Sequence, residues 1–416
     1  MEHNKKLIII LVIAIGVVSA GLGSYFVITT LLPSQESLDS KIQKLMDKYD
    51  IPSLAAGIIV NESLIWVNGF GEQPDLDTVY MIGSITKTFT ATVILQLNET
   101  GLLNLDDDIN KHLPFDVRHP SYLGDPITIR MLLTHKSGLN TNLFWSLEYY
   151  FDNQTIDWIN ENLDLGEDII PFAHRPTLGE FLNGSLNSSG PYYNSHNWYR
   201  RPGIEYRYSN AGFQLLGYLA EQVTNQSLID YVEENIFDPL NMTDSGYLYT
   251  DFIGKHAIPY EWKDGANIEY PLYNINVTGA GSIRSTILDM AKYLITFMNQ
   301  GEINGTQLLY PESVELMHSK QVSFGGPSTE GFDKEGYGLG WGLYSENITG
   351  HGGATPGYSS NMVFKKTNEG NFGMIVMFNR GSALIWDEEL VKNFIPSINQ
   401  LIFDHAEKFF QQALNT

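Results

Sequence analysis

The chain has 416 residues, with 25 Lys and Arg against 48 Asp and Glu, a net charge of −23 and no cysteine. A hydrophobic fraction of 43% supplies enough apolar side chains for a folded core, which excludes a disordered protein. The negative charge, without a long basic run, argues against nucleic-acid binding. The lack of cysteine excludes disulfides, thiol catalysis and cysteine-ligated metals.

The first 32 residues predict a membrane anchor. Lys5 and Lys6 precede an uncharged run of 26 residues, Leu7–Leu32. A helix of about 20 apolar residues already crosses a bilayer. The positive-inside rule then places residues 1–6 in the cytoplasm and residues 33–416 outside, as a single-pass cell-membrane protein. A small-residue cleavage site around Ala20 would instead make the segment a cleaved signal peptide.

Ten Asn-x-Ser/Thr sequences favour an N-glycosylated exterior protein, although an asparagine-rich chain also forms them by chance. Their asparagines are Asn61, Asn98, Asn153, Asn183, Asn187, Asn225, Asn241, Asn276, Asn304 and Asn347.

After the anchor, the first elements alternate between helix and strand patterns. Residues 36–49 predict an amphipathic helix. Two short apolar runs, 55–60 and 64–67, predict a β-hairpin. Residues 84–97 have apolar side chains at i, i+4 and i+8 and predict a helix that stops at Gly101. The later predicted elements are short helices at 127–133 and 211–223, strands at 338–344, 362–365 and 372–378, and a helix at 387–411.

This order predicts an α+β fold. Strand patterns gather at both ends of residues 33–416, and the middle is mostly helical. We therefore expect one antiparallel sheet made from N- and C-terminal segments and flanked by helices. A mostly helical subdomain, about residues 108–275, is inserted between them. Within it, the aromatic stretch 140–201 is interpreted as an insertion or lid at the mouth of a site.

Ser84-Ile85-Thr86-Lys87 is a Ser-x-x-Lys sequence at the start of a predicted helix. Residues i and i+3 share a helix face, so the lysine amine lies beside the serine hydroxyl. A serine needs a base to become a nucleophile, and lysine can serve only as the neutral amine. Its reference pKa of about 10.4 must then fall to about 7. The string alone is weak, because a capping serine followed by a solvated lysine also fits it.

Two further short motifs follow along the chain. Tyr208-Ser209-Asn210 stands in a turn that leads into the predicted helix 211–223. Tyr192-Tyr193-Asn194 also matches Tyr-x-Asn, but its aromatic surroundings favour a structural role. His351-Gly352-Gly353 is the third motif, and its glycines allow backbone N–H groups to approach a ligand closely. A glycine turn with an incidental histidine is the alternative.

The motif order Ser-x-x-Lys, Tyr-x-Asn, His-x-Gly resembles that of the serine β-lactamase-related hydrolases. These include class C β-lactamases, D-alanyl-D-alanine carboxypeptidases, D-aminopeptidases and esterases, and they resemble penicillin-binding proteins. The resemblance covers about residues 40–385. It is strengthened by four stretches, Leu132–Leu139, Gly281–Thr286, Gly338–Trp341 and Gly350–Gly357. It implies a β-lactamase/transpeptidase-like fold.

The resemblance also implies a role for each motif residue. Ser84 would be the acylated nucleophile, and Lys87 and Tyr208 would share the proton transfers. Asn210 would position the substrate and Lys87. The N–H groups of Ser84 and Ala354, on the strand edge that Gly353 shares, would form the oxyanion hole. His351 would stand where penicillin-recognising members commonly carry a cationic lysine.

The sequence therefore predicts a membrane-anchored serine hydrolase that cleaves an ester, amide or D-amino-acid peptide bond through an acyl-enzyme. Because His351 is mostly neutral near pH 7, an esterase or peptidase is favoured over an efficient β-lactamase. The alternative is a slow binding or sensor protein of the cell envelope on the same scaffold. No metal or cofactor is expected. The expected partners are a small-molecule or peptide acyl substrate and the membrane, and the exact substrate and the oligomeric state stay open.

Overall fold

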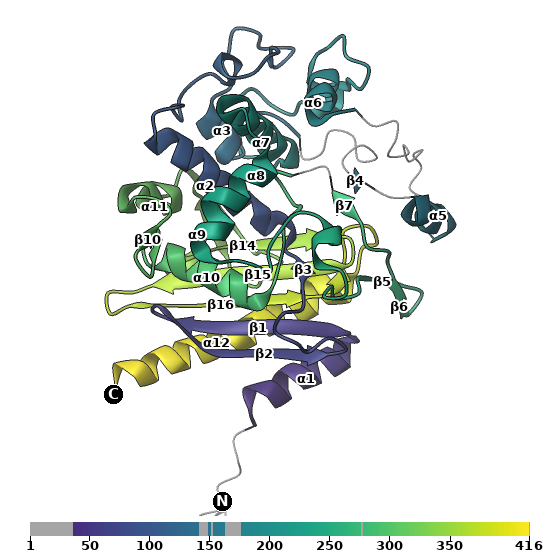
Figure 1. The fold of residues 1–416 in the computed structure, drawn as a ribbon, viewed down its shortest axis with the longest axis vertical. Helices are drawn as coiled ribbons and strands as arrows, with labels where there is room; N and C mark the ends of the chain where they lie inside the picture. Colours follow the sequence, from purple (N-terminus) through teal and green to yellow (C-terminus); the bar gives the residue numbers. More distant parts are fainter. Residues whose placement is uncertain (1–35, 141–148, 151–152, 163–175, 276–277, 416) are drawn as a thin grey trace, which may run out of the picture.

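The computed structural model describes residues 36–140, 149–150, 153–162, 176–275 and 278–415 (Figure 1). The predicted cytoplasmic and membrane-spanning segments, residues 1–6 and 7–32, lie outside the described residues. In the part of the chain that is described, no helix combines the length and apolar character needed to cross a bilayer.

The centre of the molecule is an eight-stranded antiparallel sheet with the order β11-β12-β13-β14-β15-β16-β1-β2 (Figure 1). Its strands are β1 (Ser53–Val60), β2 (Ser63–Gly71), β11 (Val322–Gly326), β12 (Lys334–Tyr337), β13 (Gly342–Tyr344), β14 (Ile348–Thr355), β15 (Tyr358–Lys366) and β16 (Asn371–Phe378). The two ends of the folded region meet where β1 pairs with β16. The prediction of one sheet from N- and C-terminal segments is confirmed.

Strand β1 shows why its sequence is a continuous apolar run. All eight of its residues are buried, because helices cover both faces of the sheet. Ala55 and Ile59 join the core on one face, while Leu54, Ile58 and Val60 join the core on the other. Successive side chains of a strand point to opposite faces, so a single strand supplies both cores.

Helices α1 (Leu38–Tyr49) and α12 (Ile395–Leu414) cover one face of the sheet (Figure 1). Ser37 caps α1 by accepting a hydrogen bond from the N–H of Ser40 at 3.1 Å. The predicted helix 36–49 is confirmed. The predicted C-terminal helix is present as α12, preceded by a π-helical turn at Leu390–Phe394.

The other face packs against α2 (Thr86–Glu99), α10 (Ile287–Met298) and the region between them (Figure 1). The remaining helices are α3 (Ile129–Leu133), α5 (Asn153–Asn162), α6 (Leu178–Leu186), α7 (Asn210–Thr224), α8 (Leu228–Val232), α9 (Asp238–Leu240) and α11 (Pro311–His318). The short strands are β3 (Tyr80–Met81), β4 (Tyr149–Tyr150), β5 (Tyr260–Lys263), β6 (Ala266–Glu269), β7 (Asn274–Ile275), β8 (Arg284–Ser285), β9 (Glu302–Ile303), β10 (Thr306–Gln307) and β17 (Arg380–Gly381). In the described part of region 108–275, helices are joined by long irregular segments, and the hairpin β5–β6 pairs with β17 to form a small sheet.

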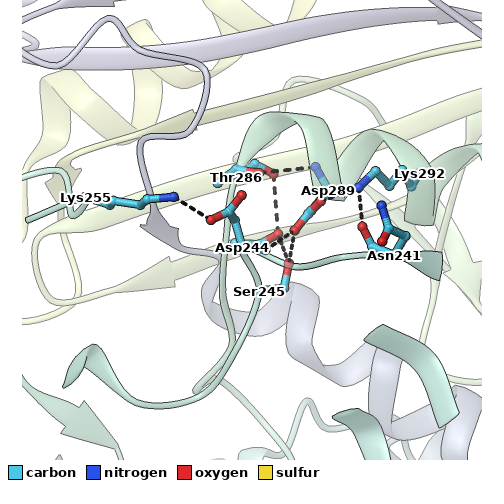
Figure 2. Close-up of polar contacts among 8 residues, drawn as sticks. Asn241, Asp244, Ser245, Lys255, Thr286, Asp289 and Lys292 are labelled. Carbon is cyan, nitrogen blue, oxygen red and sulfur yellow. Dashed lines mark hydrogen bonds and ion pairs between the residues drawn. The ribbon is translucent and has the colours of Figure 1, made fainter. Parts of the chain in front are cut away.

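A polar network ties the start of α10 to the loop that follows α9 (Figure 2). The carboxylate of Asp289 accepts hydrogen bonds from the Asp244 N–H at 2.8 Å and the Ser245 hydroxyl at 3.0 Å. It also pairs with Lys292 at 2.7 Å, and Asp244 in turn pairs with Lys255 at 2.7 Å. We call these five residues the Asp289 network; it fastens the inserted region to a helix that packs on the sheet.

Most element predictions are confirmed, and two need correction. The hairpin β1–β2 and the helices α3 and α7 lie where the sequence predicts them. The predicted helix 84–97 begins as α2 only at Thr86, after a 3₁₀ turn at Gly83–Ile85. The predicted strand 338–344 is a strand only at β13, because Gly340 has φ 78° and packs its backbone against α2.

Candidate active site

Ser84 lies in the tight turn between β3 and α2. Gly83 in this turn has φ 51°, and a Cβ there would lie 2.8 Å from the backbone nitrogen of Ala354 on β14. In the same contact, a Cβ on Gly353 would lie 2.0 Å from the carbonyl oxygen of Ile82. The two glycines therefore let the turn that carries Ser84 press directly against the strand that carries Ala354.

Lys87 is fully buried on the first turn of α2. Its Nζ donates hydrogen bonds to Ser84 Oγ at 2.9 Å and to the carbonyl oxygen of Ala280 at 2.7 Å. The structure thus places the lysine amine beside the serine hydroxyl, as the Ser-x-x-Lys spacing predicts.

Tyr208 completes the group around the serine. The Lys87 Nζ lies 5.0 Å from the centre of the Tyr208 ring, and Tyr208 lines the same cavity as Ser84. Burial raises the pKa of Tyr208 well above its usual value, and the hydrogen bond with Ser84 opposes this rise only in part. Tyr208 therefore keeps its phenol proton at neutral pH and is placed to donate it.

His135 holds the turn that carries Tyr208. Its Nδ1 accepts a hydrogen bond from the Ser209 N–H at 3.1 Å, and its ring lies 4.4 Å from the Tyr208 ring. Burial and the nearby charge of Lys87 keep the pKa of His135 well below 6.5, so the imidazole is neutral. Ser209 also caps α7 by accepting from the Gly212 N–H at 3.0 Å. The Tyr-x-Asn motif is thus fixed both by a helix cap and by a buried ring.

Asn210 is the first residue of α7 and is partly buried. Helix α7 packs against α2, which carries Lys87. This location brings Asn210 to the same end of the two helices as Ser84 and Tyr208, but Asn210 is not among the residues that line the cleft described below.

His351 lies on β14, buried and neutral. Burial, and next the positive charge of Lys87, lower its pKa to about 3. Its Nδ1–H donates to the carbonyl oxygen of Gly352 at 2.6 Å, which leaves Nε2 to accept from the Tyr337 hydroxyl at 3.0 Å. His351 is therefore an uncharged, fully engaged ring rather than a cation.

A cleft of about 360 Å³ opens over this group. Its lining includes Ser84, Tyr208, His351, Gly353 and Ala354, together with Tyr206, Glu330, Lys334, Tyr337 and Trp386. The structure therefore gathers six of the seven predicted site residues, from three separate motifs, into contact with one another or with one cavity. A larger groove of about 950 Å³ lies over α11 and the outer ends of β14 and β15, and none of these seven residues lines it.

The sequence missed several residues in and around this cleft. His135 falls inside the stretch Leu132–Leu139 that supports the family resemblance, so that stretch was the signal that could have found it. Glu330, Lys334 and Trp386 belong to no motif. Their position depends on the pairing of β11, β12 and β13 and on the path of the chain after β17.

Residues 141–148, 151–152 and 163–175 of the predicted aromatic lid, 140–201, lie outside the described residues. Its described aromatic side chains have other contacts: Trp198 packs against His119, and Tyr192 packs against Phe181. Among the described residues, those that line the cleft come from elsewhere, so Tyr206, Tyr337 and Trp386 supply its aromatic surface.

The fold and the three motifs define the class of this protein. The Beta-lactamase family model matches residues 38–384, and the chain belongs to the beta-lactamase family. This family includes serine hydrolases such as amidases, carboxypeptidases and β-lactamases. Protein flp of Staphylococcus aureus (strain N315) is a relative with 27% identity over 384 residues, which cover 89% of this chain and 67% of that protein.

Solved structures agree with this assignment. The octameric penicillin-binding protein homologue from Pyrococcus abyssi is 28% identical, with a TM-score of 0.67 over 82% of this chain and 72% of that one. A D-stereospecific amidohydrolase from Streptomyces sp. is 26% identical, with a TM-score of 0.63 over 86% of this chain and 97% of that one. A class C β-lactamase at 18% identity shares the fold, with a TM-score of 0.62 over 88% of this chain and 94% of that one.

Proposed function

We propose that this protein is a serine hydrolase that cleaves an ester, amide or D-amino-acid peptide bond through an acyl-enzyme on Ser84. The observation that carries the proposal is the 2.9 Å hydrogen bond between Lys87 Nζ and Ser84 Oγ, with the Tyr208 ring 5.0 Å from the same Nζ and in the same cavity as Ser84. Two groups able to move a proton thus meet at one nucleophile, which is the arrangement that activates a serine.

The proposed first step forms the bond between Ser84 Oγ and the substrate carbonyl carbon. In the state that attacks, Lys87 is the neutral amine and takes the serine proton, and the tetrahedral oxyanion is bound by the N–H groups of Ser84 and Ala354. Tyr208 then donates its proton to the leaving amine or alcohol as the bond to the leaving group breaks, and it recovers a proton from Lys87. A water molecule hydrolyses the acyl-enzyme by the reverse sequence of proton transfers. One oxyanion-hole donor is worth about 2.7–4 kcal/mol of barrier lowering.

The state of His351 supports an esterase or peptidase over an efficient β-lactamase. A neutral imidazole that donates to the Gly352 carbonyl and accepts from the Tyr337 hydroxyl offers no fixed positive charge to a substrate carboxylate. The similarity to a D-stereospecific amidohydrolase supports an amide or peptide of a D-amino acid as the substrate.

We also propose that residues 7–32 anchor the enzyme in the cell membrane, with residues 33–416 on the outside. The uncharged run and the preceding lysines support this proposal. Several sequon asparagines are exposed and open to glycosylation: Asn61, Asn187, Asn225, Asn241, Asn304 and Asn347. Alkaline extraction of membranes, protease treatment of intact cells, and a mass measurement before and after glycosidase test the three parts separately.

Labelling with a fluorophosphonate tests the enzyme itself. The wild type should be labelled, the Ser84→Ala variant should not, and Ser121→Ala, at an exposed loop position, should behave as the wild type. A panel of nitrophenyl esters, D-amino-acid amides and nitrocefin then identifies the substrate. Labelling without subsequent deacylation would favour the sensor alternative, and labelling that persists in Ser84→Ala would contradict the proposal.

A further inference from the structure

Two charged side chains enter the active-site cleft where the connection from β11 meets β12, whose first residue is Lys334. Glu330 and Lys334 both line the cavity that contains Ser84. The connection is held firmly from behind: the Asn399 side-chain amide of α12 donates to the Glu330 carbonyl oxygen at 2.9 Å, and Phe332 packs in the core beneath α12. A Cβ on Gly331, whose φ is 87°, would lie 2.9 Å from Pro396 Cα. The backbone therefore fixes where these two charges lie.

Glu330 is the deeper of the two. Its side chain is 16% exposed against 33% for Lys334, and the two pair at a distance of 3.4 Å. A Cβ on Gly352 would lie 3.0 Å from both Glu330 Cγ and Glu330 Oε1, so the carboxylate packs against the neighbour of His351. Glu330 Oε2 is buried and makes no hydrogen bond within the described residues, and the Lys334 ammonium faces this same oxygen as an ion pair at 3.4 Å.

A buried carboxylate oxygen that has an ion-pair partner but no hydrogen bond is incompletely satisfied, and a ligand that donates to it stabilises it. Lys334 pairs with Glu330 at a distance longer than that of a strong charge-assisted hydrogen bond, which is about 2.7–2.9 Å. Glu330 is therefore a preformed acceptor in the cleft for a cation of the substrate. Its charge extends to the reacting groups, because Glu330 is one of the causes that raise the pKa of Tyr208.

We infer that Glu330 selects substrates whose acyl part carries a free ammonium group, as in an amino-acid amide or a peptide cleaved after its first residue. Lys334 is the counter-ion of Glu330 when no substrate is bound. This inference rests on the proposed serine hydrolase function and adds the class of substrate to it. A substrate ammonium donates to Glu330 while the carbonyl carbon lies over Ser84. Lys334, nearer the mouth, is displaced toward solvent.

The test compares two substrates that differ only at the amine, D-alanine p-nitroanilide and N-acetyl-D-alanine p-nitroanilide. The wild type should prefer the free amine by about 10-fold or more in kcat/KM, since a hydrogen bond to a charged group is worth about that much. Glu330→Gln should abolish most of this preference. Lys334→Gln should increase it, because the carboxylate then lacks its competing cation.

Glu335→Gln is the matched control. Glu335 is the residue after Lys334, is exposed, and pairs with Lys320 at 3.0 Å outside the cleft. This variant should keep the wild-type preference. An unchanged preference in Glu330→Gln would overturn the inference. So would a Lys334→Gln variant that loses only substrates with a free carboxylate, because Lys334 would then be the anchor.

Binding separates this inference from the proposed chemistry. In the Ser84→Ala variant, calorimetry should show D-alaninamide binding about 10-fold more tightly than N-acetyl-D-alaninamide, and the Ser84→Ala/Glu330→Gln double variant should lose the difference. Amine-selective binding with no turnover by the wild type would overturn the hydrolase and leave the inference standing. Turnover by the wild type with equal binding of both amides would overturn the inference about Glu330 and leave the hydrolase proposal standing.

Discussion

Two lysines on the helices that pack against the same face of the sheet have opposite surroundings. Lys292 on α10 is 31% exposed and pairs with the Asp289 carboxylate at 2.7 Å (Figure 2). Lys87 on α2 is fully buried and donates to a serine hydroxyl and a backbone carbonyl. A lysine paired with a carboxylate forms an ion pair, whereas a lysine beside a serine hydroxyl lies next to a group with which it can exchange a proton. The Asp289 network therefore stabilises the fold, whereas the group around Ser84 is arranged for catalysis.

The largest expected effect comes from removing the amine of Lys87, and removal of the Lys292 amine is its control. Lys87→Met should lower kcat/KM by about 10³-fold, within the usual range for loss of a general base. Lys292→Met should leave kcat/KM within about twofold of the wild type, because a partly exposed structural pair does not reach the cleft. Initial rates with a nitrophenyl ester and the rate of fluorophosphonate labelling measure both. Equal labelling rates for Lys87→Met and the wild type would remove Lys87 from the mechanism.

Tyr208→Phe keeps the ring and deletes the proton that burial retains on the phenol. The rate with an amide substrate should fall by about 10²-fold, because the amine needs a proton to leave. A nitrophenyl ester, whose leaving group departs as an anion, should be affected much less. Tyr310→Phe, at a position 60% exposed on the surface, is the control. Equal losses on both substrates would show that Tyr208 acts on the nucleophile instead of the leaving group.

The local motifs explain how much of the site could be predicted. Ser84 and Lys87 are one helical turn apart, so their contact follows from the backbone period alone. Tyr208 and His351 could be found because each stands in a short motif with glycine or a helix start beside it. Glu330 and Lys334 reach the cleft only after β11, β12 and β13 have paired. No local period encodes that pairing.

The fold follows the same rule. Strands β1 and β16 are apolar runs that the sequence displays directly, and both were predicted. Strand β14, with the sequence Ile-Thr-Gly-His-Gly-Gly-Ala-Thr, contains little that distinguishes a strand, because its glycines serve the contacts at Gly353 with Ile82 and Ser360. Residues selected for close approach at the site thus weaken the pattern of the strand that carries them.

Asp289→Asn is expected to lower the stability of the protein and leave its catalysis unchanged. The change removes the charge that Lys292 pairs with and weakens the acceptor for the Asp244 N–H and the Ser245 hydroxyl. The free energy of unfolding, from urea denaturation, should fall by about 2–3 kcal/mol. The kcat/KM of the folded protein should be unchanged. Asp404→Asn, at an exposed position on α12, should change stability by less than about 0.5 kcal/mol. A loss of activity without a loss of stability would show that the Asp289 network takes part in catalysis and would contradict its purely structural role.

Glu261 differs from Asp289 because its buried carboxylate accepts hydrogen bonds from backbone amides. Its Oε1 accepts from the Gly357 N–H at 2.9 Å, and its Oε2 accepts from the Ile385 N–H at 3.4 Å. Burial raises its pKa from 4.5 to about 7, and the two amides oppose the rise only in part. A carboxylate that charges within the fold near neutral pH makes the stability of the protein depend on pH.

Because the folded state favours the protonated acid, the stability that Glu261 contributes is complete below about pH 4.5 and is lost as the pH rises through about 7. A pKa change of one unit corresponds to about 1.4 kcal/mol of stability. Because the titration is partial at both ends of the interval, the free energy of unfolding falls by about 2 kcal/mol between pH 5 and pH 7.5. Glu261→Gln stays neutral, so its unfolding free energy relative to the wild type should rise by that amount over this interval in urea melts. Glu62→Gln, in the exposed β1–β2 turn, should follow the wild type at both pH values. Parallel stability curves for Glu261→Gln and the wild type would mean that the amides alone satisfy the charged carboxylate.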